Sequence, residues 1–197
     1  MEYNQQLMLD WIEHMDQVAL LWINAKHTEW LDTFMIFVTN KFTWIPFYVL
    51  LLFLMWKQYR SKIYWLIACV FALILFADQG SNLMKDSFKR YRPCHNIDLQ
   101  SKVHLVNNKC GGKFGFVSAH AANSMALALF VVLMLRKKYA VLVPIMISYT
   151  LLISYSRIYL AQHYPLDILG GWMLGILVAL LVYRLFSRYS LFSNQSI

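Results

Sequence analysis

The sequence has few charged side chains, and this scarcity excludes an ordinary soluble domain. Charged residues make up 14% of the 197 residues, whereas 59% are hydrophobic. Soluble domains are nearer half apolar, and the apolar residues here fall in blocks, so we expect a polytopic membrane protein. The chain lacks internal repeats, low-complexity tracts and linkers, which predicts a single domain over residues 1–197. It also lacks a basic start followed by an apolar run, so we expect no cleavable signal peptide.

The apolar blocks predict an all-α membrane helix bundle with five to six transmembrane helices. Five blocks are candidates for spans, at residues 42–56, 63–84, 118–135, 140–155 and 165–186. A span needs about 20 residues, or fewer where flanking groups reach the interface. Residues 1–40 are apolar at helical spacing but interrupted, which predicts one or two amphipathic helices at the membrane interface. A sixth span within residues 18–40 remains the alternative.

Basic residues in the short connections predict which side of the membrane each end faces. The plain basic loops carry Lys57, Arg60, Lys62, Arg136, Lys137, Lys138, Arg184 and Arg188. The opposite side carries as many, namely Lys85, Lys89, Arg90, Arg92, Lys102, Lys109, Lys113 and Arg157. The second set is interleaved with histidine, serine and aspartate, as in a binding site. We therefore place the plain loops in the cytoplasm, in a bacterial inner membrane, with the polar face toward the periplasm or exterior. The net charge of +8 fits anionic lipid or an anionic substrate.

Three segments of this polar face carry residues that suit a phosphate group. They are residues 85–93, 116–120 and 156–167. Arginine presents a planar fork that matches phosphate oxygens, and lysine a compact charge. Ser118 stands where an N-cap belongs, so its hydroxyl and the next backbone N–H groups, from Ala119 onward, can face an anion. We interpret Lys89 and Arg90 as a solvated run beside the membrane rather than as site residues.

Two histidines lie in these segments. Pro165 fits the first turn of the last apolar helix, which puts His163 just before that helix and Asp167 inside its first turn. The Asp167 carboxylate can then reach the His163 ring, fix its tautomer and leave the other nitrogen free to attack. His120 follows Ser118 closely and lacks such a partner in the sequence, which suits an acid or base.

These segments resemble the motifs of the type-2 phosphatidic acid phosphatase (PAP2) superfamily of membrane lipid phosphatases. Its first motif, a lysine, six residues and Arg-Pro, is matched by KDSFKRYRP, with Lys85, Arg92 and Pro93. Its second, Pro-Ser-Gly-His, is VSAH here, with Val117 and Ala119 in place of proline and glycine. Its third, Ser-Arg, five residues, His, three residues and Asp, is matched by SRIYLAQHYPLD, residues 156–167.

The resemblance implies a role for each matched residue. It makes His163 the nucleophile that forms a phosphohistidine, Asp167 the group that orients it, and His120 the acid and then the base. The phosphate-binding residues would be Lys85, Arg92, Ser118, Ala119 and Arg157. The resemblance implies no metal and no other cofactor, and no carboxylate or Cys/His cluster with ligand spacing lies on this face.

The implied function is hydrolysis of a phosphate monoester or diphosphate on a lipid headgroup, with a phospholipid or an isoprenoid phosphate in the bilayer as substrate. Undecaprenyl diphosphate is slightly favoured, while phosphatidylglycerol phosphate, phosphatidic acid and lipid A phosphates remain open. The alternative is a catalytically inactive protein that binds or transports lipid phosphates, since Asp78 and Gln79 lie within a predicted span and intramembrane charge often marks a transport path. We expect no nucleic-acid partner and no obligate protein partner.

The sequence has three cysteines. Cys94 follows the first motif and Cys110 precedes the second, so both lie in one long loop on the predicted oxidising side. Cys69 lies within an apolar block. We therefore predict a Cys94–Cys110 disulfide that closes the loop; two unpaired thiols are the alternative.

Overall fold

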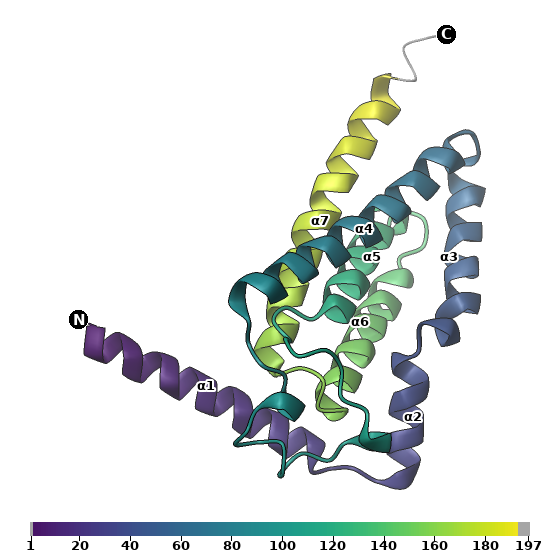
Figure 1. The fold of residues 1–197 in the computed structure, drawn as a ribbon. Helices are drawn as coiled ribbons and strands as arrows, with labels where there is room; N and C mark the ends of the chain where they lie inside the picture. The colour runs from purple at the N-terminus through teal and green to yellow at the C-terminus, as the bar shows by residue number, and fades with distance from the viewer. Residues whose placement is uncertain (1, 193–197) are drawn as a thin grey trace.

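A computed structural model describes residues 2–192 of the chain (Figure 1). Within this range the chain forms seven α-helices and no β-strand, as the all-α prediction requires. The α-helices are α1 (Glu2–Asn24), α2 (Glu29–Thr39), α3 (Ile45–Gln58), α4 (Ile63–Phe88), α5 (Ala119–Leu135), α6 (Leu142–Tyr159) and α7 (Pro165–Phe192). Short 3₁₀ turns are η1 (Lys41–Trp44), η2 (Arg60–Lys62), η3 (Pro93–His95) and η4 (Val106–Asn108).

Helix α5 lies at the centre of the bundle, between α4, α6 and α7 (Figure 1). Its sequence is rich in alanine, and Ala121, Ala122 and Ala126 are buried. Small side chains let helices approach closely in a membrane protein. Gly175 of α7 shows how close the approach is, because a Cβ there would lie 2.5 Å from the carbonyl oxygen of Ala122.

The predicted spans agree with the helices in four of five places. Helices α4, α5, α6 and α7 coincide with the predicted blocks at 63–84, 118–135, 140–155 and 165–186. Three of them, α4, α6 and α7, are long and apolar enough to cross a membrane, and α5 is a shorter apolar helix. The fifth block, at 42–56, overlaps α3, which has only 14 residues, so it stays a predicted span. Helix α3 continues α2 across a 65° bend, so the two together make at most one broken span.

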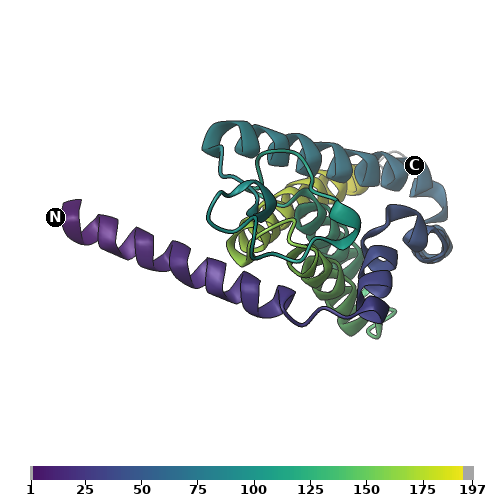
Figure 2. The same ribbon diagram turned by 60° about the horizontal axis from the view of Figure 1, so that its bottom comes forward.

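The N-terminal region forms two helices, as the amphipathic pattern predicts. Helix α1 extends from the end of the bundle (Figure 2), and it is not among the described helices that are apolar enough to span a membrane. One side of α1 is exposed and apolar, with Leu7, Trp11, Val18 and Trp22. The other side contacts the bundle through buried Leu20 and Asn24. The number of spans and the interfacial position of α1 stay predictions.

The two ends of the bundle carry different kinds of residue. The ends of α3, α5 and α7 and the start of α4 meet at one end, where the plain basic loops lie. The end of α4, the start of α5 and the connection from α6 to α7 meet at the other. All three motif segments therefore lie at the same end, as the sequence predicts.

Candidate active site

The loop between α4 and α5 folds over the motif end of the bundle (Figure 2). Lys89 ends α4 in a left-handed conformation, with φ of 49°, and the chain then pairs with the segment before α5. The Arg92 N–H donates to the carbonyl of Lys113 at 3.1 Å, and the Gly115 N–H donates to the carbonyl of Arg90 at 2.8 Å. These bonds fix the backbone at Arg92 against the segment that leads into α5.

The predicted disulfide is present in this loop and confirms the pairing. Cys94 and Cys110 are joined with their Cα atoms 6.0 Å apart. Together with His95, these cysteines make the one group of three potential metal-ligating side chains found among residues 2–192. Both thiols are used in the disulfide, so this group is a structural crosslink. It lies next to Arg92 in sequence and closes the paired segments.

His163 and Asp167 lie together at the start of α7. Pro165 is the first residue of that helix, as predicted. The Asp167 Oδ2 accepts the Tyr164 N–H at 3.0 Å, which is the reciprocal bond of a capping box. The same oxygen lies 3.4 Å from His163 Nδ1, the outer limit of a hydrogen bond. Nδ1 has no better partner among the described residues, so Nε2 is the nitrogen that Asp167 leaves free.

The His163 ring is buried, with only 2% of the residue exposed. Burial lowers the pKa of His163 to about 4, and the charges of Arg157 and Arg92 act in the same direction while Asp167 opposes them. Removing a cationic ring from water is unfavourable, and two nearby cations add repulsion. The imidazole is therefore neutral near pH 7, which is the form that carries a free lone pair.

Ser118 is the N-cap of α5, as predicted. Its φ and ψ are extended, and its Oγ accepts the Ala121 N–H at 3.5 Å. Ala119 begins the helix, so it needs no left-handed conformation and replaces glycine without strain. Val117 is fully buried, and its side chain lies where a Cβ on Gly170 would collide with it. The structure thus accommodates both Val117 and Ala119, the two departures from the second motif.

The motif cations surround this region. Arg92 Nε donates to the carbonyl of Phe114 at 3.1 Å. Arg157 is held by Thr39 of α2, whose Oγ1 accepts from Nη1 at 2.7 Å, while its buried Nε has no partner among the described residues. A buried donor without a partner is costly and marks a place where an acceptor belongs. Lys85 contacts Asn82 at 3.3 Å and interacts electrostatically with Arg92 and Arg157.

His120 completes the set of predicted residues. Arg157, His163, Arg92 and Lys85 all act on its ring electrostatically, so the structure gathers the three motif segments around one point. His120 is exposed whereas His163 is buried. One histidine is thus open to water and the other is enclosed.

The structure also corrects the prediction for Arg90 and adds Gln162. Arg90 is not a solvated residue: its Nη1 donates to Asp167 Oδ1 at 2.8 Å and its Nη2 donates to Asp16 Oδ2 at 2.6 Å. Lys89, by contrast, is exposed, as expected. Gln162 accepts from Arg92 Nη1 at 3.1 Å and donates to the carbonyl of Lys109 at 2.9 Å. No sequence signal marked Gln162, because its partners come from a distant loop.

Comparison with known proteins identifies the family. The sequence pattern of the PAP2 superfamily matches residues 65–190. The lipid A 4'-phosphatase of Bacteroides thetaiotaomicron is 34% identical over 171 residues, covering 85% of this chain and 75% of the relative. The lipid A 4'-phosphatase of Porphyromonas gingivalis is 31% identical over 90% of this chain and 75% of its own length. The undecaprenyl-diphosphatase of Sulfolobus acidocaldarius is 27% identical over 81% of this chain and 72% of its own.

Two solved structures share the fold. The PAP2-type phosphatidylglycerolphosphate phosphatase of Bacillus subtilis superposes with a TM-score of 0.68 at 22% identity, over 90% of this chain and 87% of that chain. LpxE of Aquifex aeolicus superposes with a TM-score of 0.62 at 24% identity, over 84% and 93%. The chain belongs to the PAP2 superfamily, and it is a multi-pass membrane lipid phosphatase that works without a metal ion.

Proposed function

We propose that this protein removes a phosphate group from a lipid headgroup through a phosphohistidine on His163. The observation that carries the proposal is the buried pair of His163 Nδ1 and Asp167 Oδ2, 3.4 Å apart. This pair leaves Nε2 as the nucleophile in one fixed tautomer. The whole chain, residues 1–197, would act as one membrane-embedded phosphatase domain, with the catalytic motifs in residues 85–167.

In the first step, neutral His163 attacks phosphorus with Nε2, and the bond from phosphorus to the lipid oxygen breaks. Protonated His120 gives its proton to that departing oxygen. The phosphorylated imidazole is cationic, and the Asp167 carboxylate stabilises it. The equatorial oxygens would be held by Lys85, Arg92, Arg157, Ser118 and the N–H groups from Ala119 onward at the start of α5.

In the second step, His120 acts as a base. It takes a proton from a water molecule, whose oxygen bonds to phosphorus while the P–N bond breaks. Inorganic phosphate leaves, His163 is neutral again, and His120 again carries its proton. The exposure of His120 supports this role, because the group that activates water must be reached by water.

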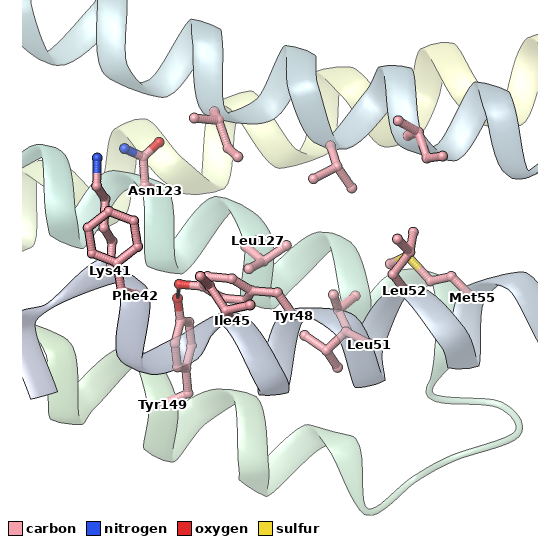
Figure 3. Close-up of a pocket in the computed structure, with 14 residues that line it drawn as sticks. Lys41, Phe42, Ile45, Tyr48, Leu51, Leu52, Met55, Asn123, Leu127 and Tyr149 are labelled. Carbon is pink, nitrogen blue, oxygen red and sulfur yellow. Dashed lines mark hydrogen bonds between the residues drawn. The ribbon is translucent and has the colours of Figure 1, made fainter.

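An apolar cavity next to the site supports a lipid as the substrate. It has a volume of about 660 Å³ and lies between α3, α4, α5 and α6 (Figure 3). Its lining is mainly apolar, and its hydroxyl groups, on Tyr48 and Tyr149, bond to each other at 2.9 Å. Lys41 and Asn123 stand together at one end (Figure 3). Asn123 follows His120 by one turn of α5, so the cavity begins beside the proposed acid and suits a hydrocarbon chain.

Among lipid phosphates, we favour the 4'-phosphate of lipid A. Both relatives above 30% identity are named lipid A 4'-phosphatases, whereas the undecaprenyl-diphosphatase is 27% identical. Lipid A thus moves ahead of undecaprenyl diphosphate, which the sequence alone had slightly favoured. We further propose that the chain lies in the bacterial inner membrane with its active site toward the periplasm. The plain basic loops favour the cytoplasm, and the active site lies at the opposite end of the bundle.

A panel of lipids tests the proposal. Full-length protein in detergent micelles is incubated with bisphosphorylated lipid A, undecaprenyl diphosphate, phosphatidylglycerol phosphate and phosphatidic acid, and released phosphate is measured. We expect the fastest turnover with lipid A and a product that keeps its 1-phosphate by mass spectrometry. Faster turnover of undecaprenyl diphosphate would reverse the choice of substrate. Binding of these lipids without any phosphate release would favour the inactive binding protein instead.

A further inference from the structure

One arginine bridges two buried carboxylates behind the proposed nucleophile. Arg90 donates from Nη1 to Asp167 Oδ1 at 2.8 Å and from Nη2 to Asp16 Oδ2 at 2.6 Å. The side chains of Asp16 and Asp167 are 2% and 0% exposed, and that of Arg90 is 20% exposed. A guanidinium can serve both acids at once because its donors form a rigid planar fork, which a lysine ammonium lacks.

Asp16 also contacts the helix that carries Asp167. Its Oδ1 accepts the Leu166 N–H at 2.9 Å. The first N–H groups of a helix have no partner inside the helix, and a carboxylate is favourable at that end. Two backbone N–H groups at the α7 N-terminus therefore donate to carboxylates: Leu166 to Asp16 of α1 and Tyr164 to Asp167 of α7. Both contacts lie immediately after His163.

Arg90 makes two further contacts, and the helix that carries Asp16 is anchored beside it. Its guanidinium lies over the ring of Tyr164, 4.2 Å from the centroid, as in a cation–π contact. Its carbonyl accepts the Gly115 N–H at 2.8 Å. Leu20, one turn beyond Asp16, is fully buried against Tyr164 and Ile168 and anchors α1 beside the pair. The arginine has little freedom to leave either carboxylate.

This network fixes the plane of the Asp167 carboxylate. Oδ1 is held by Arg90 and Oδ2 by the Tyr164 N–H, so Oδ2 faces His163 Nδ1 in one orientation. A carboxylate that could rotate would orient the imidazole less well, and partners behind a functional histidine commonly serve this purpose. We propose that Arg90 and Asp16 are positioning residues that aim Asp167 at His163, so that α1 supports the active site through Asp16.

The inference rests on the proposed function, in which His163 attacks phosphorus. It extends beyond the family match, because Asp16 lies outside residues 65–190. Among the described residues, neither Asp16 nor Arg90 forms a hydrogen bond or ion pair with His163, and both reach it through Asp167. Their removal should therefore slow the chemical step and leave substrate affinity unchanged.

The test compares three variants of the full-length protein in detergent: Arg90→Met, Arg90→Lys and Asp16→Asn. The matched controls are Lys89→Met, the exposed neighbour in the same loop, and Asp10→Asn, an exposed acid on the same helix. With p-nitrophenyl phosphate we expect kcat to fall by about 10- to 100-fold with KM unchanged, the range found for partners behind metal-bound histidines. The controls should keep the wild-type kcat. The double variant Asp16→Asn/Arg90→Met should lose no more than Arg90→Met alone, because both changes break one network.

Thermal midpoints and elution profiles establish that each variant is folded. If Arg90→Met fails to fold, Asp16→Asn and Arg90→Lys decide the question, since both keep the side-chain volume nearly unchanged. Wild-type kcat in a folded Asp16→Asn variant would overturn the inference, and so would a loss confined to KM, which would place Arg90 on the substrate. Absence of turnover or of label on His163 in the wild-type protein would instead defeat the proposed function. If the wild-type protein is active and labelled on His163 while the variants keep the wild-type kcat, only the positioning role is defeated.

Discussion

The backbone N–H of Ser118 donates a hydrogen bond to the backbone carbonyl of Asp167 at 3.0 Å. This bond joins the N-cap of α5 directly to the first turn of α7. Gly171, one turn later in α7, permits the approach, because a Cβ there would lie 2.6 Å from the Ser118 carbonyl oxygen. Two helix N-termini are thus fixed side by side. The N-terminus of α7 donates to the Asp167 and Asp16 carboxylates, and the N-terminus of α5 is the one that we place at the phosphate.

The two histidines should differ in what their loss does to the covalent intermediate. We expect His163→Ala to abolish turnover and leave no phosphoenzyme. His120→Ala should slow turnover by about 10²–10⁴-fold, as for a lost general acid or base, and still allow some adduct with p-nitrophenyl phosphate, whose leaving group needs little help. Asp167→Asn should fall between them. Rapid quench with ³²P-labelled substrate and alkaline handling detects the adduct; label that survives in His163→Ala and vanishes in His120→Ala would exchange the two roles.

The acid limb of the pH profile should lie unusually low. His163 must be neutral to attack, and its pKa is lowered to about 4 by burial, compared with about 6.5 for a free histidine. We therefore expect kcat/KM to stay constant from neutral pH down to about 4 on this account and to fall below it. Initial rates of phosphate release from about pH 3 to 8, which brackets the pKa of folded His163 and that of a free histidine, would locate the acid limb. A limb near the ordinary histidine value would contradict it.

The same shift makes the fold sensitive to acid, which supplies a control. The unfolded chain takes up a proton on this histidine below about pH 6.5, whereas the folded chain does so only near 4. The contribution of His163 to stability is thus present above the unfolded value and is lost as pH falls toward the folded one. Samples returned to neutral pH after each incubation should regain full rate, which separates titration from unfolding.

The disulfide should stabilise the loop that carries Arg92. We expect Cys94→Ser to lower the free energy of unfolding by about 3 kcal/mol, the chain-entropy value for a loop of this size, and to lower activity because Arg92 is less well held. Thermal unfolding in detergent measures the first effect and phosphate release the second. Cys69→Ser, which leaves the crosslink in place, should change neither. Peptide mapping without reductant that finds Cys94 and Cys110 free in membrane-extracted protein would contradict this prediction.

Filling the apolar cavity should harm lipid substrates selectively. Leu127 lines it on α5, so Leu127→Trp should lower kcat/KM for a long-chain lipid phosphate by about tenfold, a modest cost for a blocked pocket. The rate with p-nitrophenyl phosphate, which has no chain to place, should not change. Leu177→Trp on the exposed face of α7 is the matched control. Equal losses with both substrates would mean that the cavity does not hold the chain.

The sidedness of the active site can be measured by labelling. In a Cys69→Ser background that keeps the disulfide, a single cysteine is placed at Gln100, in the loop over the site, or at Lys137, in the plain basic loop; both positions are exposed. An impermeant thiol reagent applied to spheroplasts should label position 100 only. Labelling at position 137 alone would reverse the proposed orientation.

Local spacing accounts for much of what the sequence predicts correctly. The N-cap at Ser118, the helix start at Pro165 and the pairing of His163 with Asp167 all involve residues within one helical turn. Such relationships depend on helix geometry alone, which spacing expresses directly. The disulfide was also predictable, because Cys94 and Cys110 lie in the same loop and the third cysteine, Cys69, lies in an apolar block.

The chain by itself thus determined its class, its motif residues and their common end of the bundle, since hydropathy blocks and short spacings are local properties. Only the tertiary structure decided which groups stand behind those residues. In the sequence, Arg90 is one more basic residue beside a predicted span. Its partners Asp16 and Asp167 are 74 and 77 positions away along the chain. The bend between α2 and α3 and the cavity between α3 and α5 arise in the same way. Contacts between distant helices follow from how their side chains pack, and no spacing along the chain encodes that arrangement.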